Sequence, residues 1–180
     1  MENQLSKQKK LDLRYLRMAR IWAENSYCKR RQVGALVVKD KMIISDGYNG
    51  TPSGFENVCE ENNVTKPYVL HAEANAITKL ARSSNNSEGS TLYVTASPCI
   101  ECSKLIIQSG IKRVVYAEKY RLTDGVDLLK RAGVVVEYMN PDEEEASQET
   151  EDSQEETSLQ KETPEKYERK KRERNVSILN

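Results

Sequence analysis

The hydrophobic pattern of this chain changes repeatedly between a period of two and a period of about 3.6 residues, and this alternation limits its fold more than any other feature. Leu13, Leu16 and Ala19 share one helical face near the start. Two apolar, β-branched segments follow, separated by a short polar turn, as is typical of antiparallel strands. The expected helices cover residues 13–23, 71–81, 98–109 and 124–132, and the expected strands cover residues 33–39, 42–48, 91–95, 112–118 and 134–139.

This order of elements predicts an α/β protein with three α/β/α layers and a mixed sheet of five strands. The Val- and Ile-rich strands are typical of strands buried on both faces. Ser97 is expected to cap the third helix, with Pro98 in the first helical position and Gly110 at the end.

The formal net charge of zero conceals two parts of opposite charge. Residues 1–141 contain 21 basic and 15 acidic residues, whereas residues 142–180 contain 7 basic and 13 acidic residues. The acidic part is rich in Ser, Gln and Thr and buries too little apolar surface to offset the entropy of ordering it. We therefore predict one domain over residues 1–139 and a disordered or loosely helical tail over residues 140–180. The basic run at residues 166–174 is expected to be solvated, with a weak nucleic-acid contact as the alternative.

No apolar run approaches the length of about 18 residues that spans a membrane, and the polar N-terminus lacks the apolar core of a signal peptide. These features predict a cytoplasmic protein with no membrane partner. In such a reducing compartment, the four cysteines are expected to be thiols or metal ligands rather than disulfides.

Two short motifs lie where helices are expected to begin. The first is His71-Ala-Glu73, and the second is Pro98-Cys99-x-x-Cys102. Alone, the first motif usually consists of exposed residues with no specific role, and the second is also found in redox-active cysteine pairs. Together, at the starts of two helices, they form the H-x-E and P-C-x-x-C signature of zinc deaminases.

The residue types explain the chemistry that this signature predicts. One imidazole and two thiolates from His71, Cys99 and Cys102 occupy three tetrahedral positions on one Zn²⁺ per chain and leave the fourth for water. Helix N-termini favour the thiolate form of the cysteines. Glu73 is expected to act as the catalytic proton shuttle between the zinc-activated water and the substrate; the alternative is an exposed glutamate that merely favours the helix dipole.

Five segments give the chain a resemblance to the deoxycytidylate (dCMP) deaminases over residues 10–139. They are residues 28–35, 47–54, 71–77, 93–102 and 108–116. The resemblance implies a cytidine-deaminase fold and the hydrolysis of dCMP to dUMP and ammonia, which supplies dUMP for thymidylate synthesis. The residues that match the family's functional positions are His71, Cys99 and Cys102 for zinc, Glu73 for proton transfer, Asn49 for the sugar hydroxyl, and Ala72 and Ser97 for main-chain contacts with the pyrimidine.

The resemblance is less informative about phosphate and effector binding. The candidates for phosphate contact are Arg31, Lys119 and Arg121, and a solvated surface is an equally good interpretation. Residues 50–54 read as a turn from their composition. The resemblance implies instead a regulatory pocket at Gly50, Thr51, Pro52, Ser53 and Gly54, in which dCTP with Mg²⁺ activates and dTTP inhibits a homo-oligomer, commonly a hexamer.

Cys28 and Cys59 are not part of the zinc signature. Free, buried or half-buried thiols are the expected state for both. Some phage relatives hold a second zinc ion with cysteines from these regions and a histidine, but His71 is the only histidine in this chain.

Two alternative functions stay open. A tRNA adenosine deaminase, or another nucleoside deaminase of the same fold, shares the zinc signature, although Asn75 and the segment at residues 47–54 favour a nucleotide substrate. A non-catalytic zinc-binding interaction module is the alternative of another class. Glu73 argues against that module, because a structural zinc site has no use for a proton shuttle.

Overall fold

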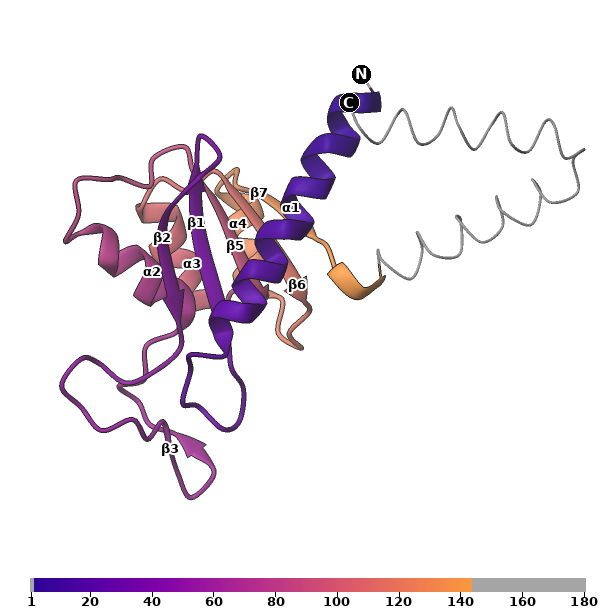
Figure 1. Cartoon of the computed structure of the whole chain (residues 1–180). Coiled ribbons are helices and arrows are strands. Elements are labelled where there is room, and N and C mark those ends of the chain that lie inside the picture. The colour runs from indigo at the N-terminus through magenta and orange to yellow at the C-terminus, as the bar shows by residue number, and fades with distance from the viewer. Residues whose placement is uncertain (1, 144–180) are drawn as a thin grey trace, which may run out of the picture. The chain divides into compact units, whose positions relative to one another are not determined.

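The computed structural model describes residues 2–143 and contains a mixed sheet, as predicted (Figure 1). The strands of this sheet are β1 (Gly34–Lys39), β2 (Met42–Tyr48), β5 (Thr91–Ala96), β6 (Arg113–Glu118) and β7 (Val135–Tyr138). Strand β1 pairs antiparallel with both β2 and β5, whereas β5, β6 and β7 run parallel. The strand order is β2-β1-β5-β6-β7.

Helices cover both faces of the sheet. The helices are α1 (Glu2–Ala23), α2 (Ala72–Leu80), α3 (Ile100–Gln108) and α4 (Asp124–Arg131). Helix α1 crosses one face in Figure 1, and the other three pack on the opposite face. Successive side chains of β1 point to opposite layers: Leu36 packs in a cluster with Leu16 of α1, whereas Val37 packs in a cluster with Ala76 of α2. The predicted three-layer α/β/α architecture is therefore confirmed.

The N-terminus of α2 lies directly against the end of β2. A Cβ atom on Gly47 would come within 2.2 Å of the carbonyl oxygen of Ala72, so this close approach requires glycine. Next to this contact, the Asn75 side chain donates a hydrogen bond of 2.9 Å to the Tyr48 carbonyl oxygen. These contacts fix the position of the first turn of α2 on the sheet.

The start of α3 differs from the predicted one. Cys99, rather than Ser97, is the N-cap residue, and α3 begins at Ile100. The prediction was wrong because the Ser97 hydroxyl accepts a hydrogen bond of 2.8 Å from the Tyr120 amide instead. The Ser97 N–H donates to the Glu118 carbonyl oxygen at 2.9 Å, so Ser97 still continues the pairing of β5 with β6.

A small hairpin that was not predicted lies between β2 and α2. Its strands, β3 (Glu60–Glu61) and β4 (Val64–Thr65), have two residues each, which is too short to give a strand period. Asn62 and Asn63 turn the chain with positive φ angles of 50° and 62°, a backbone that asparagine tolerates better than most residues.

The two ends of the domain extend beyond the predicted elements. Helix α1 begins at Glu2, well before Leu13. At the other end, Arg20 donates a hydrogen bond of 3.0 Å to the Asn140 side chain. The rest of the predicted tail, from residue 144, lies outside the described residues, so the domain boundary stays a prediction. Among the helices in residues 2–143, none has both the length and the apolar character needed to cross a membrane.

Candidate metal centre and substrate cavity

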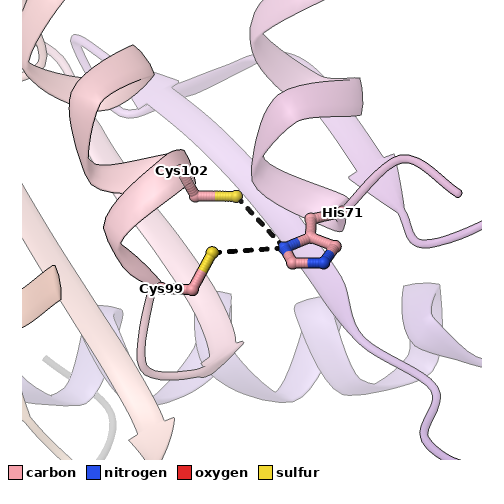
Figure 2. Close-up of side chains that lie close together, drawn as sticks. All are labelled: His71, Cys99 and Cys102. Carbon is pink, nitrogen blue, oxygen red and sulfur yellow. Dashed lines mark hydrogen bonds between the residues drawn. The ribbon is translucent and has the colours of Figure 1, made fainter. Parts of the chain in front are cut away.

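His71, Cys99 and Cys102 come together where two helices begin (Figure 2). His71 is the N-cap residue of α2, Cys99 is the N-cap residue of α3, and Cys102 lies in the first turn of α3. The His71 Nδ1 atom faces both sulfur atoms and lies 3.4 Å from each Sγ atom. Within residues 2–143, this is the one group of three or more His, Cys, Asp or Glu side chains close enough together to hold a metal ion.

The geometry of these three side chains fits zinc. Zn–N bonds of about 2.0 Å and Zn–S bonds of about 2.3 Å at tetrahedral angles separate a nitrogen from a sulfur by about 3.5 Å. The two N–S distances of 3.4 Å match that value. Thiolate and imidazole ligands also suit zinc better than magnesium or calcium. Three protein ligands leave a fourth position open, as in catalytic zinc sites.

Electrostatic interactions within the group favour a thiolate. A hydrogen bond from Cys102, together with one from His71, lowers the pKa of Cys99 to about 3. Donating that hydrogen bond raises the pKa of Cys102, and burial raises it further. Cys99 would therefore offer a thiolate to a bound dication, and Cys102 would have to release its proton to offer a second thiolate.

Glu73 lies in the first turn of α2 and is 4% exposed. Burial raises the pKa of its carboxyl group, because a low-dielectric environment disfavours the charged form. A carboxyl group with a raised pKa exchanges protons closer to neutral pH than an ordinary glutamate does.

A cavity of about 350 Å³ opens onto the metal group and Glu73. The predicted substrate contacts that line it are Asn49, Ala72, Ser97 and Arg31. Lys119 and Arg121, the other predicted phosphate contacts, do not line it. They flank Tyr120, which does, and the Lys119 Nζ atom lies 4.5 Å from the centre of the Tyr138 ring.

The Asn49 side chain holds the neighbouring chain segment in place. Its Oδ1 atom accepts a hydrogen bond of 2.7 Å from the Val33 amide, and its Nδ2 atom donates one of 2.9 Å to the Arg31 carbonyl oxygen. Asn49 therefore fixes the backbone that carries Arg31 as well as lining the cavity itself.

Sequence reasoning missed several residues of the cavity wall. Arg30 lines it and donates a hydrogen bond of 3.1 Å to the Thr65 hydroxyl of the unpredicted hairpin. Arg31 forms an ion pair of 2.5 Å with Glu118, and its guanidinium carbon lies 5.8 Å from the centre of the Tyr120 ring. The one feature of the sequence that could have indicated Arg30 is its position next to Arg31, and no feature of the sequence indicated Thr65.

The predicted effector residues line a second, smaller cavity of about 160 Å³. Its wall combines the glycine-rich loop with aromatic side chains and one cysteine. The lining residues are Gly50, Thr51, Pro52, Ser53 and Gly54, with Tyr27, Tyr48, Phe55, Asn57 and Cys59. Gly54 has a φ angle of +92°, which favours glycine at this turn.

The prediction of free thiols at Cys28 and Cys59 was wrong. The two residues form a disulfide, with their Cα atoms 5.1 Å apart. Their separation of 31 residues carries no pairing signal, and it is the fold that brings the segment before β3 against the segment after α1. Both sulfurs are used in this bond, so the structure gives no support to a second zinc site at these cysteines.

The fold and the metal group define a class of protein, and comparison with known families gives the same class. Residues 9–118 match the cytidine and deoxycytidylate deaminase zinc-binding region. The chain belongs to this family.

Two of three relatives share a narrower name, deoxycytidylate (dCMP) deaminase. The chain is 34% identical over 165 residues to the deoxycytidylate deaminase of Enterobacteria phage T4, covering 67% of this chain and 86% of that protein. It is 38% identical over 134 residues to ComE operon protein 2 of Bacillus subtilis (strain 168), covering 72% and 71%. The crystal structure of dCMP deaminase from the cyanophage S-TIM5 in complex with dCMP and dUMP superposes with a TM-score of 0.69 and 47% identity, covering 77% and 99%.

Proposed function

We propose that this chain hydrolyses dCMP to dUMP and ammonia and thereby supplies dUMP for thymidylate synthesis. The observation that carries the proposal is one cavity lined by His71 and Cys99 of the metal group, by buried Glu73 and by two arginines. The 47% identity to a dCMP deaminase crystallised with dCMP and dUMP supports the choice of substrate.

Glu73 is the proton carrier in this proposal. His71, Cys99 and Cys102 would hold a zinc ion, which when bound would supply a water whose pKa is lowered to about 7. Glu73 accepts the proton that this water gives up and passes it to N3 of cytosine as the oxygen adds to C4. The same carboxyl group carries the remaining water proton to the amine, the C4–N bond breaks, and C4 keeps the oxygen as a carbonyl.

Main-chain groups at the cavity orient the pyrimidine. The Ala72 N–H lies in the first turn of α2, where a helix offers no internal acceptor, so it is available to the O2 carbonyl of cytosine. The Ser97 N–H already pairs with Glu118, so the Ser97 carbonyl oxygen is the group assigned to the amine. Asn49 is assigned to the sugar hydroxyl.

Arg31 is assigned to the phosphate. It lines the cavity, and a guanidinium offers paired donors to phosphate oxygens. Its ion pair with Glu118 has exposed fractions of 36% and 52% for the two side chains, so solvent weakens this pair and phosphate can replace Glu118. Each charge-assisted hydrogen bond contributes about 1.5 to 3 kcal/mol, which a neutral nucleoside cannot gain.

Regulation by end products is the second part of the proposal. The cavity formed by residues 50–54 is assigned to dCTP with Mg²⁺ as activator and to dTTP as inhibitor in a homo-oligomer, with the hexamer as the form to test. Its described lining contains no Lys or Arg, so a second copy of the chain has to supply positive charge to a triphosphate. We expect the rate of deamination to depend sigmoidally on dCMP concentration. Addition of dCTP with Mg²⁺ should make this dependence hyperbolic, and dTTP should suppress the rate.

Ammonia release from dCMP, CMP, deoxycytidine, cytosine and an adenosine-containing tRNA hairpin tests the substrate assignment. We expect dCMP to be preferred and deoxycytidine to be a poor substrate. Equal turnover of dCMP and deoxycytidine indicates a nucleoside deaminase, and turnover of the hairpin alone indicates a tRNA adenosine deaminase. A zinc-loaded protein that acts on none of them is the non-catalytic binding module.

A further inference from the structure

The Cys28–Cys59 disulfide joins two parts of the chain that shape the substrate cavity. Cys28 lies in the segment between α1 and β1, and Cys59 directly precedes β3. Cys28 lines the cavity that contains the metal group, whereas Cys59 lines the smaller cavity of the glycine-rich loop. The disulfide therefore links the walls of the two cavities.

Hydrogen bonds next to the disulfide extend its influence along the cavity wall. The carboxylate of Glu60, the neighbour of Cys59, accepts hydrogen bonds from the amides of Lys29 (3.3 Å) and Arg30 (3.2 Å). Both amides belong to the segment that begins at Cys28. The disulfide and Glu60 thus hold the segment with Arg30 against the hairpin.

A second set of contacts connects the disulfide to Asn49. The Ser26 hydroxyl donates a hydrogen bond of 2.7 Å to the Asn49 carbonyl oxygen and accepts one of 3.2 Å from the Cys28 amide. The Cys28 Sγ atom lies 3.7 Å from the same carbonyl oxygen. The Asn49 side chain in turn holds the Arg31 backbone. Direct contacts therefore connect Cys28 to Asn49 and, through the Asn49 side chain, to Arg31.

We propose that Cys28–Cys59 is a reversible redox switch that sets the affinity of the cavity for the nucleotide. This inference rests on the proposed function for the identity of the nucleotide. In the disulfide form the wall that carries Arg30, Arg31 and Asn49 is held for binding. In the dithiol form Cys59 and Glu60 are released from Cys28, and the wall loses its covalent restraint.

The chemistry is a two-electron thiol–disulfide exchange with a dithiol reductant. One thiolate of the reductant attacks Cys28 Sγ, the S–S bond breaks, and Cys59 leaves as a thiolate that takes up a proton. The second thiol of the reductant then displaces Cys28, which also takes up a proton. The products are two cysteine thiols and the oxidised, disulfide form of the reductant.

The nucleotide is expected to protect the disulfide. Cys28 is 4% exposed and Cys59 is 1% exposed, so Cys28, which lines the substrate cavity, is the more accessible of the two residues to a reductant. A nucleotide in that cavity blocks access to Cys28. Because binding linkage is reciprocal, a nucleotide that prefers the disulfide form also stabilises that form.

The test compares the full-length, zinc-loaded protein before and after reduction with tris(2-carboxyethyl)phosphine, with zinc content measured in both states. Peptide mass spectrometry is expected to find Cys28 linked to Cys59 before reduction. Calorimetric titration with dUMP is expected to give a Kd about fivefold weaker after reduction, at the lower end of the range usual for coupled sites. The KM for dCMP is expected to rise by the same factor with kcat unchanged.

The matched control is the double variant Cys28→Ser/Cys59→Ser. It is expected to bind dUMP like the reduced protein and to be insensitive to the phosphine. Equal dUMP affinity in the two redox states of the native protein, or the absence of the linked peptide, overturns the switch. So does uptake of a second zinc ion per chain on reduction, because the pair is then a metal site. Calorimetry measures binding and needs no turnover. A protein that binds dUMP but does not deaminate dCMP therefore contradicts the proposed function, while the comparison of dUMP affinity in the two redox states still tests the switch.

Discussion

Asp12 and Arg113, which lie 101 residues apart, are joined by two parallel hydrogen bonds: Arg113 Nη1 to Asp12 Oδ1 at 2.9 Å, and Nη2 to Oδ2 at 2.8 Å. The Tyr93 hydroxyl donates a third hydrogen bond of 2.5 Å to the same carboxylate. Asp12 is 1% exposed. This network ties α1 to β5 and β6 and so holds one helical layer on the sheet.

Asp12→Asn is expected to lower the free energy of unfolding by about 1.5 to 3 kcal/mol, because Arg113 and Tyr93 lose a charged hydrogen-bond partner, whereas Glu137 still pairs with the Arg113 guanidinium. Urea unfolding followed by circular dichroism measures the change. The control is Glu88→Gln at the exposed pair between Glu88 and Lys112, whose atoms are 3.7 Å apart. That variant should change stability by less than about 1 kcal/mol. Equal effects for the two variants contradict the importance of the buried network.

The same network predicts a pH dependence. Burial of Asp12 acts to raise its pKa, but hydrogen bonds from Arg113, Tyr93 and Gln8 outweigh burial, and the pKa is lowered from its ordinary value of 3.8. A lowered folded-state pKa stabilises the fold above pH 3.8, and this contribution is lost as the pH falls through the folded-state value. The stability difference between the native protein and Asp12→Asn should be constant from pH 5 to 7 and should shrink below about pH 4. A difference that grows on acidification contradicts this prediction.

Glu73→Gln is expected to keep one zinc ion per chain and to lose nearly all dCMP turnover, because the three zinc ligands are unchanged and only the proton carrier is removed. His71→Ala is expected to lose both the metal and the turnover. Metal analysis by mass spectrometry and an ammonia-release assay measure the two properties. If Glu73→Gln loses zinc while His71→Ala keeps it, the assigned roles are reversed.

Gly47→Ala is expected to weaken zinc binding and to lower the melting temperature. The added Cβ atom would lie 2.2 Å from the Ala72 carbonyl oxygen, so the start of α2, with His71 at its N-cap, has to move. Gly50→Ala is the control, because its nearest neighbouring atom would be 4.0 Å from the new Cβ. Thermal unfolding and a zinc chelator titration should separate the two variants, and similar results for both exclude the close approach as the cause.

A chain that ends at Pro141 is expected to fold and to deaminate dCMP with little change in kcat and KM, because every residue assigned to the two cavities precedes this position. The full-length protein should show rapid hydrogen exchange at the amides of residues 144–180. Loss of activity on truncation, or strong protection of these amides, shows that the tail has a structural or regulatory role.

The sequence by itself determined the layer architecture and the metal group. The helix and strand periods depend on residues a few positions apart, and their order favours one α/β arrangement. The grouping of His71, Cys99 and Cys102 was predictable for a related reason: the Cys99 and Cys102 spacing is local, and His71 is the only histidine in the chain. Glu73 is fixed to His71 by the first turn of α2.

Only the tertiary structure decided which distant segments complete the cavity. Three such features have no local signal in the sequence. They are the hairpin that brings Thr65 to Arg30, the disulfide between Cys28 and Cys59, and the position of Arg31 rather than Lys119 in the cavity wall. These contacts join loops whose ends are placed by the sheet and by α1. The physical reason is that the packed helices and strands fix where each loop starts and ends, and this determines which loop residues come into contact. Loop residues therefore show no hydrophobic periodicity from which these contacts could be predicted.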